Sequence, residues 1–251
     1  MGEDMFDLTG KVAVITGGSR GLGRELALGM SRAGADVVIA SRKLANCETA
    51  ARAITAETGR RAMPYALHAG RWNEAEPFVD AVYDEFGRCD VLVNNAGMSP
   101  HYDKLTDVSE QLFDSVVNLN FKGPFRLSVL FGEHMKAAGS GSIINISSTA
   151  SVRPPVYALP YAGAKAGLNA LTEGLAKAYG PEVRVNTIMA GMMRTDIAKS
   201  WDEEIAQADA RLTALKRIAD PAELLGAALL LASGAGSYIS GATLRADGGI
   251  P

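Results

Sequence analysis

The sequence predicts an α/β fold, in which a doubly wound parallel sheet carries helices on both faces. Short runs rich in Val and Ile alternate along the chain with longer stretches of helical periodicity. The apolar content of these runs is nearly continuous rather than alternating, which is typical of strands buried on both faces of a parallel sheet. Repeated β-α units joined by right-handed crossovers then place helices on each face.

The expected elements follow one another in regular order. The expected strands span residues 11–16, 36–40, 62–67, 90–94, 142–147, 183–188 and 242–246. The expected helices span about 21–33, 43–58, 73–87, 109–138, 160–180 and 220–233. Asp220 and Pro221 are residues preferred at an N-cap and at a first helical position, so they mark the start of the last helix. No linker divides residues 1–251, so we expect a single domain, with the irregular stretch 190–215 as a candidate lid.

Composition excludes several functional classes. The chain has 251 residues, 47% of them hydrophobic, and a net charge of −3, so no basic footprint for nucleic acid or an anionic membrane is present. No apolar run approaches the roughly 20 residues that span a bilayer. The N-terminus lacks a basic region followed by an apolar stretch, so we expect a cytoplasmic protein. Cys47 and Cys89 fit no disulfide or zinc pattern and are expected to be small apolar fillers.

A glycine-rich turn follows the first expected strand and leads into the first expected helix. It reads Thr16-Gly17-Gly18-Ser19-Arg20-Gly21-Leu22-Gly23. Glycines permit a tight turn and let backbone N–H groups approach a pyrophosphate at the positive end of the helix. The spacing of Gly17, Gly21 and Gly23 differs from the common G-x-G-x-x-G fingerprint. A purely structural turn is the alternative, but the position in the first β-α unit favours nucleotide binding.

Tyr161 and Lys165 are four residues apart in an expected helix, so their side chains project from the same face. A nearby cation favours the phenolate, so Lys165 should lower the pKa of Tyr161 and make it useful as a general acid or base. The pair taken alone is more typical of an ordinary helix surface than of a catalytic site.

These motifs together resemble those of the short-chain dehydrogenase/reductase family. The resemblance covers nearly the whole chain and also includes Asn94-Asn95-Ala96-Gly97 after the fourth strand and Ile146-Ser147-Ser148 at the end of the fifth. It implies a Rossmann fold with a seven-stranded parallel sheet, hydride transfer to or from a nicotinamide dinucleotide, and assembly as a homotetramer. Members of the family include carbonyl reductases and 3-oxoacyl thioester reductases.

The resemblance also implies catalytic roles for particular residues. Tyr161 would be the acid in reduction and the base in oxidation, and Lys165 would also bind the nicotinamide ribose. Ser148 would donate a hydrogen bond to the substrate oxygen; Ser147 is its competitor, but alternation along a strand sends the two side chains to opposite sides. The helix asparagine that holds a water beside the lysine corresponds to Asn120, because Gly and Phe follow at the family's spacing, whereas Asn118 lacks them. A structural role at a helix kink is the alternative for Asn120.

The end of the second strand indicates NADP(H) rather than NAD(H). Ser41 stands where an NAD-preferring relative would carry Asp, and Arg42 follows it. Arg20 in the glycine turn is a second basic residue, whose guanidinium cation could bind a 2′-phosphate. The alternative is that Arg42 and Lys43 are solvent-exposed residues at the start of a helix and bind no phosphate. The family's Asp-Val after the third strand is replaced here by His68-Ala69, so adenine should be held differently, with His68 as partner or as surface filler.

Further cofactor contacts are implied by the resemblance alone. The expected cofactor site comprises Gly17, Ser19, Arg20, Gly21, Leu22, Gly23, Ser41, Arg42, His68, Ala69, Asn94, Ala96, Gly97, Tyr161, Lys165, Gly191 and Thr195. The family's proline before Gly191 is Ala190 here, which leaves that turn less constrained.

The sequence therefore predicts an NADP(H)-dependent oxidoreductase acting on a ketone or secondary alcohol, with no metal and a small-molecule substrate. Its expected pocket is mostly apolar and includes His101, Tyr157 and Met192. A 3-oxoacyl thioester, a sugar and a polycyclic alcohol all remain open as substrates. The alternative is a non-catalytic NADP(H)-binding sensor on the same fold, which has no need of the complete Ser, Tyr and Lys set.

Overall fold

The computed structural model describes residues 5–194 and 210–250. These residues form one seven-stranded sheet in the order β3-β2-β1-β4-β5-β6-β7, and all neighbouring strands are parallel. The strands are β1 (Val12–Thr16), β2 (Asp36–Ser41), β3 (Ala62–Ala66), β4 (Val91–Asn94), β5 (Gly141–Ser148), β6 (Val183–Ala190) and β7 (Thr243–Ala246). The prediction of a doubly wound α/β fold is confirmed.

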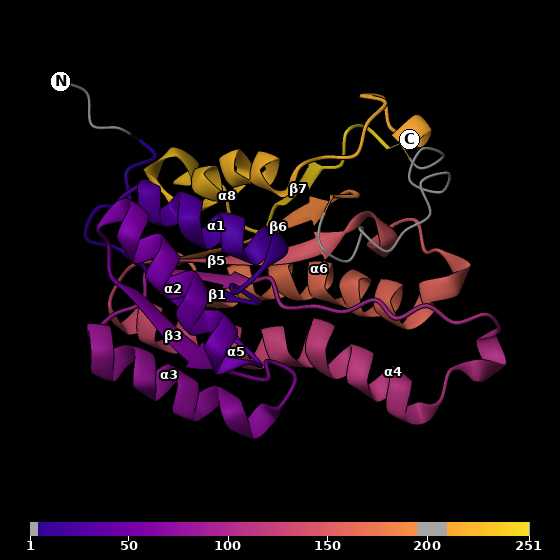
Figure 1. The fold of residues 1–251 in the computed structure, drawn as a ribbon, viewed down its shortest axis with the longest axis horizontal. Helices are drawn as coiled ribbons and strands as arrows, with labels where there is room; N and C mark the ends of the chain where they lie inside the picture. The colour runs from indigo at the N-terminus through magenta and orange to yellow at the C-terminus, as the bar shows by residue number, and fades with distance from the viewer. Residues whose placement is uncertain (1–4, 195–209, 251) are drawn as a thin grey trace.

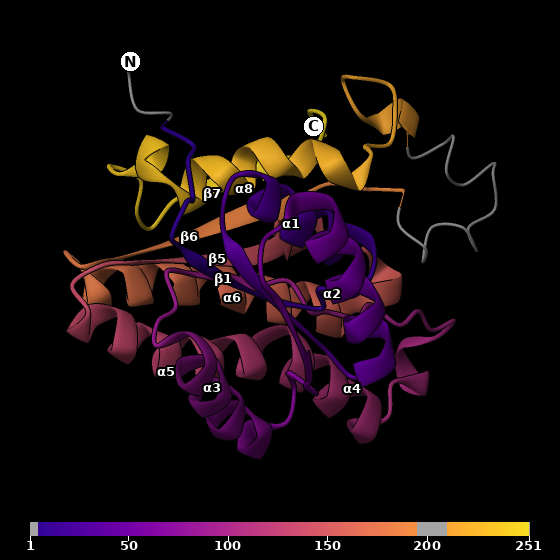
Figure 2. The ribbon, with the colours of Figure 1, turned by 60° about the vertical axis from the view of Figure 1, so that its left-hand side comes forward.

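Helices cover both faces of the sheet, as Figures 1 and 2 show. One layer consists of α1 (Gly21–Arg32), α2 (Leu44–Thr58) and α8 (Leu225–Ala232). The other contains α3 (Trp72–Phe86), α5 (Gly123–Ala137) and α6 (Leu159–Tyr179), with α4 (Glu110–Val117) leading into α5. Among the described helices, none is both long and apolar enough to cross a membrane.

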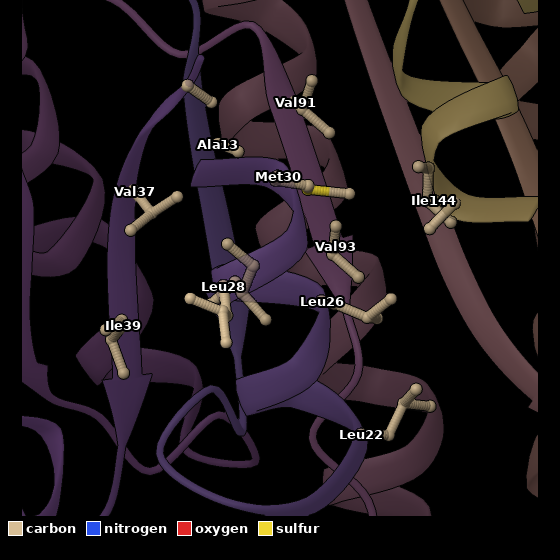
Figure 3. Close-up of a cluster of buried hydrophobic side chains, with 14 of the residues drawn as sticks. Ala13, Leu22, Leu26, Leu28, Met30, Val37, Ile39, Val91, Val93 and Ile144 are labelled. Carbon is tan, nitrogen blue, oxygen red and sulfur yellow. The ribbon is translucent and has the colours of Figure 1, made fainter. Parts of the chain in front are cut away.

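The core beneath α1 shows why this helix lies on the sheet. Leu22, Leu26 and Met30 form one stripe and are buried against β-strand side chains, among them Val93 (Figure 3). Burying a side chain of this size contributes about 1.5–3 kcal/mol relative to leaving it exposed. The stripe therefore fixes α1, and with it the glycine-rich turn that precedes it.

The expected helix at 109–138 is interrupted by a π-helical turn at Asn118–Lys122. The Gly123 N–H bonds to the carbonyl of Asn118, five residues back, which adds one residue to the turn. Gly123 is required there, because an added Cβ would lie 2.0 Å from the carbonyl oxygen of Ala69. The π turn directs Asn120 inward, where its side chain is fully buried.

The last helical segment begins as expected. The Asp220 carboxylate accepts a hydrogen bond from the Ala222 N–H at 3.0 Å, and Pro221 opens a 3-10 turn (Pro221–Leu224) that continues as α8. Of the candidate lid at 190–215, residues 195–209 lie outside the described part of the chain.

The strand order places the functional edge. β1 lies between β2 and β4, and the chain leaves β1 and β4 in opposite directions, which makes their carboxyl ends the topological switch point. Ligands of open α/β sheets bind in the crevice at this point.

Candidate active site

The glycine-rich turn connects β1 to α1, and its backbone atoms pack closely against one another. Gly17 and Gly21 have φ values of +68° and +51°, in the region where a side chain is strained. An added Cβ on Gly23 would lie 2.3 Å from the carbonyl oxygen of Gly17. Arg20 is the N-cap residue of α1, and no side chain among residues 5–194 and 210–250 caps this helix end. Its first N–H groups are therefore available to an anion.

We expect the substitution Gly23→Ala to weaken binding of the expected NADPH about 5- to 160-fold, because the turn must move to relieve an overpacking cost of about 1–3 kcal/mol and so loses its place against the cofactor. Titration of NADPH fluorescence measures the effect. Gly174→Ala in α6 is the matched control, since a Cβ there meets nothing within 4 Å. Equal NADPH affinity in the Gly23→Ala and Gly174→Ala proteins would contradict the assignment of the turn.

Two residues that the sequence motifs left unassigned join this turn to the end of β4. The Thr16 hydroxyl oxygen accepts hydrogen bonds from the N–H groups of Asn95 and Ala96, both at 3.0 Å. The Asn95 amide donates to the carbonyl of Thr16 at 2.8 Å. Asn95 belongs to the Asn94-Asn95-Ala96-Gly97 motif, which was the available signal. Asn94 instead donates to Ser128 and Asn145 inside the core, both at 2.9 Å.

Ser148, Tyr161 and Lys165 lie together at the ends of β5 and α6. The Lys165 ammonium is 5.7 Å from the centroid of the Tyr161 ring. The Ser148 hydroxyl interacts with the Tyr161 hydroxyl, while Ser147 is turned to the backbone of α6, where its hydroxyl donates to the Lys165 carbonyl at 3.4 Å. Alternation along β5 thus separates the two serines as expected.

Burial controls the proton affinities of this group. Burial raises the pKa of Tyr161, and the interaction with Ser148 offsets only part of this effect. The expected lowering of the pKa of Tyr161 by Lys165 is therefore not found in the protein alone. Burial also lowers the pKa of Lys165 from 10.5 to about 8. The ammonium donates a hydrogen bond to the carbonyl of Ile146 at 2.7 Å.

Asn120 ties the π turn to the loop after β4. Its amide donates to the carbonyls of Met98 and Val116, at 2.9 and 3.0 Å, and its oxygen accepts from the Met98 N–H at 3.4 Å. An added Cβ on Gly97 would lie 2.8 Å from this oxygen and 3.7 Å from the nitrogen of Lys165. Gly97 thus brings the β4 loop directly against the buried lysine. The water-holding role of Asn120 stays a prediction.

The end of β2 lies beside the glycine-rich turn. The Ser41 hydroxyl donates to the Ser19 hydroxyl at 2.8 Å, and the buried Cys47 thiol is 3.0 Å from Ser41. Arg20 and Arg42 are exposed. A polar cluster flanked by two exposed cations therefore stands where the sequence places the 2′-phosphate.

The structure gives different results for three other expected cofactor contacts, His68, Gly191 and Thr195. The His68 Nδ1 atom is buried and has no hydrogen-bond partner within the described part of the chain. The Gly191 N–H donates to the Ala246 carbonyl at 3.0 Å, and an added Cβ would lie 2.6 Å from Cα of Asp247. Thr195 lies outside the described residues.

The residues present fit a dinucleotide. The glycine cradle leaves no space for side chains, the N-terminus of α1 has no side-chain cap from its N-cap residue, and the buried His68 Nδ1 atom lacks a hydrogen-bond partner within the described residues. The Lys165 ammonium uses one of its three N–H donors on the Ile146 carbonyl. The strand order brings these separately predicted motifs to the same edge of the sheet.

Comparison with known proteins agrees with this geometry. The family model described as short chain dehydrogenase matches residues 11–206. The short chain dehydrogenase/reductase astE of Aspergillus oryzae is 36% identical and covers 99% of this chain and 97% of its own length. The crystal structure of a short-chain type dehydrogenase/reductase from Mycobacterium marinum is 31% identical, with a TM-score of 0.91 over 98% of this chain and 97% of the other.

A further solved structure shows a relative with both its ligands. L-sorbose reductase from Gluconobacter frateurii, in complex with NADPH and L-sorbose, is 29% identical, with a TM-score of 0.92 over 98% of each chain. On the family match and the full-length relatives together, the chain belongs to the short-chain dehydrogenase/reductase family of oxidoreductases.

Proposed function

We propose that this protein transfers a hydride between NADP(H) and a ketone or secondary alcohol, with Tyr161 as general acid and base. The observation that carries the proposal is the meeting of Ser148, Tyr161 and Lys165 beside Gly97, at the sheet edge that also holds the glycine-rich turn. A pure sensor needs the turn but has no use for this catalytic set.

The site residues divide the work of carbonyl reduction. The hydride itself comes from NADPH when it is bound. Ser148 donates a hydrogen bond to the substrate oxygen, and Tyr161 delivers the proton as negative charge develops there. The Lys165 ammonium stabilises the resulting phenolate and holds the nicotinamide ribose. Asn120 holds a water through which the proton is replaced from solvent.

The raised pKa of Tyr161 suits the reductive direction. Because burial disfavours the phenolate, the tyrosine keeps its proton at neutral pH and can act as the acid. Proton loss in the opposite direction requires a positive neighbour, and the Lys165 ammonium lies 5.7 Å from the ring to provide it.

We assign the preference for NADP(H) to Ser41, Arg42 and Arg20. The Ser19–Ser41 hydroxyl pair and the exposed guanidinium groups offer donors and positive charge to a 2′-phosphate. The similarity to an L-sorbose reductase that binds NADPH supports this assignment.

We expect Ser41→Asp to reverse the cofactor preference. The new carboxylate repels the 2′-phosphate and accepts a hydrogen bond from the ribose 2′-hydroxyl, so the ratio of NADPH to NADH affinity should fall at least about a hundredfold, or about 2.7 kcal/mol. Titrations with both reduced cofactors measure it. Ser41→Asn is the uncharged control; an unchanged ratio in Ser41→Asp would reject the assignment of this strand end.

A substrate panel tests the function itself. L-sorbose, acetoacetyl-coenzyme A and 9,10-phenanthrenequinone represent a ketose, a 3-oxoacyl thioester and a polycyclic ketone, and NADPH absorbance reports turnover. Oxidation of NADPH with any of these substrates supports the proposed enzymatic function. Tight NADPH binding without turnover across the panel would favour the sensor.

We also propose a cytoplasmic homotetramer. The family resemblance supports one two-fold interface on the expected helices 109–138 and 160–180 and another on residues 224–251. Mass measurement in solution distinguishes a tetramer from smaller species.

A further inference from the structure

The Tyr102 side chain lies in an unusual position at the start of α6, the helix that carries Tyr161 and Lys165. Its hydroxyl donates to the carbonyl of Val156 at 3.0 Å and accepts from the N–H of Leu159 at 2.8 Å. These two backbone groups are three residues apart, the spacing at which a 3-10 turn would join them directly. The Tyr102 hydroxyl stands between them instead, where the 3-10 turn Val156–Ala158 passes into α6.

This contact replaces a cap that the helix itself lacks. The N-cap residue of α6 is Ala158, whose methyl group cannot accept a hydrogen bond, and Pro160 in the first turn has no N–H. The Leu159 N–H is therefore the first donor of the helix that needs a partner. It finds one in a side chain from a different segment, 57 residues away in sequence.

The segment that provides the hydroxyl is fixed at its other end as well. The Asn120 side chain bonds both backbone groups of Met98, at 2.9 Å and 3.4 Å. Residues 98–102 therefore run from the π turn, beside Lys165, to the first turn of α6. Between these anchors, the ring of His101 packs on that of Tyr157, with centroids 4.7 Å apart. Any substrate that contacts this segment contacts a strap tied at both ends to the catalytic elements.

From this geometry we infer that Tyr102 is a positioning residue, which ties the 98–102 segment to the first turn of α6 and so sets the place of the Tyr161 hydroxyl. Tyr161 is the second residue after Leu159, and the reaction depends on its distance from the substrate oxygen. A displacement of about 1 Å in a reacting group can lower a rate about a hundredfold. The inference rests on the proposed function, since it concerns the acid of that reaction.

Because of where Tyr102 lies, its effect on the placement of α6 can be distinguished from an effect on the stability of the fold. The bridge is close to solvent, so a water molecule can occupy the place of a lost hydroxyl and satisfy both Val156 and Leu159. Water cannot join the 98–102 segment to α6. Loss of the hydroxyl should therefore leave the fold intact and loosen the connection between the two segments.

The test compares Tyr102→Phe with Tyr179→Phe, which removes a tyrosine hydroxyl at the other end of α6 and leaves the bridge intact. With the fastest ketone of the panel above, Tyr102→Phe should lower kcat about 10- to 30-fold. The isotope effect on kcat with NADPH deuterated at the transferred position should increase, because hydride transfer becomes slower than product release. The NADPH Kd should stay within about twofold, and Tyr179→Phe should keep kcat within about twofold.

A second measurement needs no turnover. Amide hydrogen exchange at Leu159 should be protected in the wild-type protein and in Tyr179→Phe, and at least about tenfold faster in Tyr102→Phe. Unprotected Leu159 in the wild type would overturn the inference, as would a Tyr102→Phe enzyme with unchanged kcat and isotope effect, even if its Tm is lower. If the wild type turns over no ketone, the proposed function fails, and the exchange data alone still decide whether Tyr102 holds the helix start.

Discussion

Tyr161→Phe is expected to lower kcat about a thousandfold or more while the NADPH Kd stays within about threefold. The substitution removes one oxygen, and with it the only proton of this side chain that can reach a developing alkoxide. General acid catalysis contributes about 10²- to 10⁴-fold, and the substitution removes the whole of this contribution. Steady-state kinetics with the active ketone of the panel and NADPH fluorescence titration measure the two quantities.

Tyr179→Phe is the matched control for this experiment. Tyr179 is the last residue of the same helix, and its hydroxyl donates to the carbonyl of Val129 at 3.3 Å, far along α6 from Ser148. Its loss should cost about 0.5–1.5 kcal/mol of stability and leave kcat unchanged. A Tyr161→Phe enzyme with wild-type kcat, or one that loses NADPH affinity as strongly as rate, would contradict the role given to Tyr161.

The architecture could be predicted from sequence because its determinants are local. Each strand is a short apolar run, and the stripe of Leu22, Leu26 and Met30 defines the buried face of α1 without reference to any other segment. The π turn could not be predicted in this way. The helical period continues through it, and the extra residue is held by contacts of Asn120 and Gly123 with loops that are distant in sequence.

The same distinction applies to the site. Tyr161, Lys165 and the glycine-rich turn are short motifs whose spacing is visible in the chain. Asn95 and Tyr102 act through partners in other segments. Asn95 lies in a short motif that does not indicate its partner Thr16, and no local pattern marks Tyr102. Electrostatics was the least predictable property: adjacency of Lys165 indicated a lowered pKa for Tyr161, but the depth of burial, which sequence does not give, reverses the direction.

Lys165→Met is expected to have two opposite effects, a loss of activity of about a thousandfold and a gain in stability of the cofactor-free protein. The rate falls because no cation remains to stabilise the phenolate of Tyr161, and NADPH affinity should fall as the contact to the nicotinamide ribose is lost. Stability should increase because the hydrogen bond to the Ile146 carbonyl offsets only part of the cost of burying the ammonium, and the pKa lowered to about 8 reflects this cost. Lys177→Met, at an exposed position of the same helix, should change neither quantity.

The size and pH dependence of the gain follow from the shift in pKa. A fall from 10.5 to about 8 corresponds to about 3 kcal/mol, and the loss of a partner for the Ile146 carbonyl takes back about 1 kcal/mol or more, so a net gain of about 1–2 kcal/mol is expected at pH 7. The penalty on the wild type is complete below about pH 8, where Lys165 is charged in both states. As the pH rises from 8 to 10.5, the folded protein loses this proton before the unfolded chain does, so wild-type stability increases and the advantage of the variant disappears.

Urea denaturation of both cofactor-free proteins between pH 7 and pH 10.5 measures this difference. A variant less stable than the wild type at pH 7, or an advantage that does not decline with pH, would show that Lys165 is not held as a desolvated cation. The expected result has a direct functional meaning. The fold bears the cost of a buried charge because the reaction needs that charge beside a phenol, and the same burial that weakens the folded state strengthens the field of the ammonium on the tyrosine.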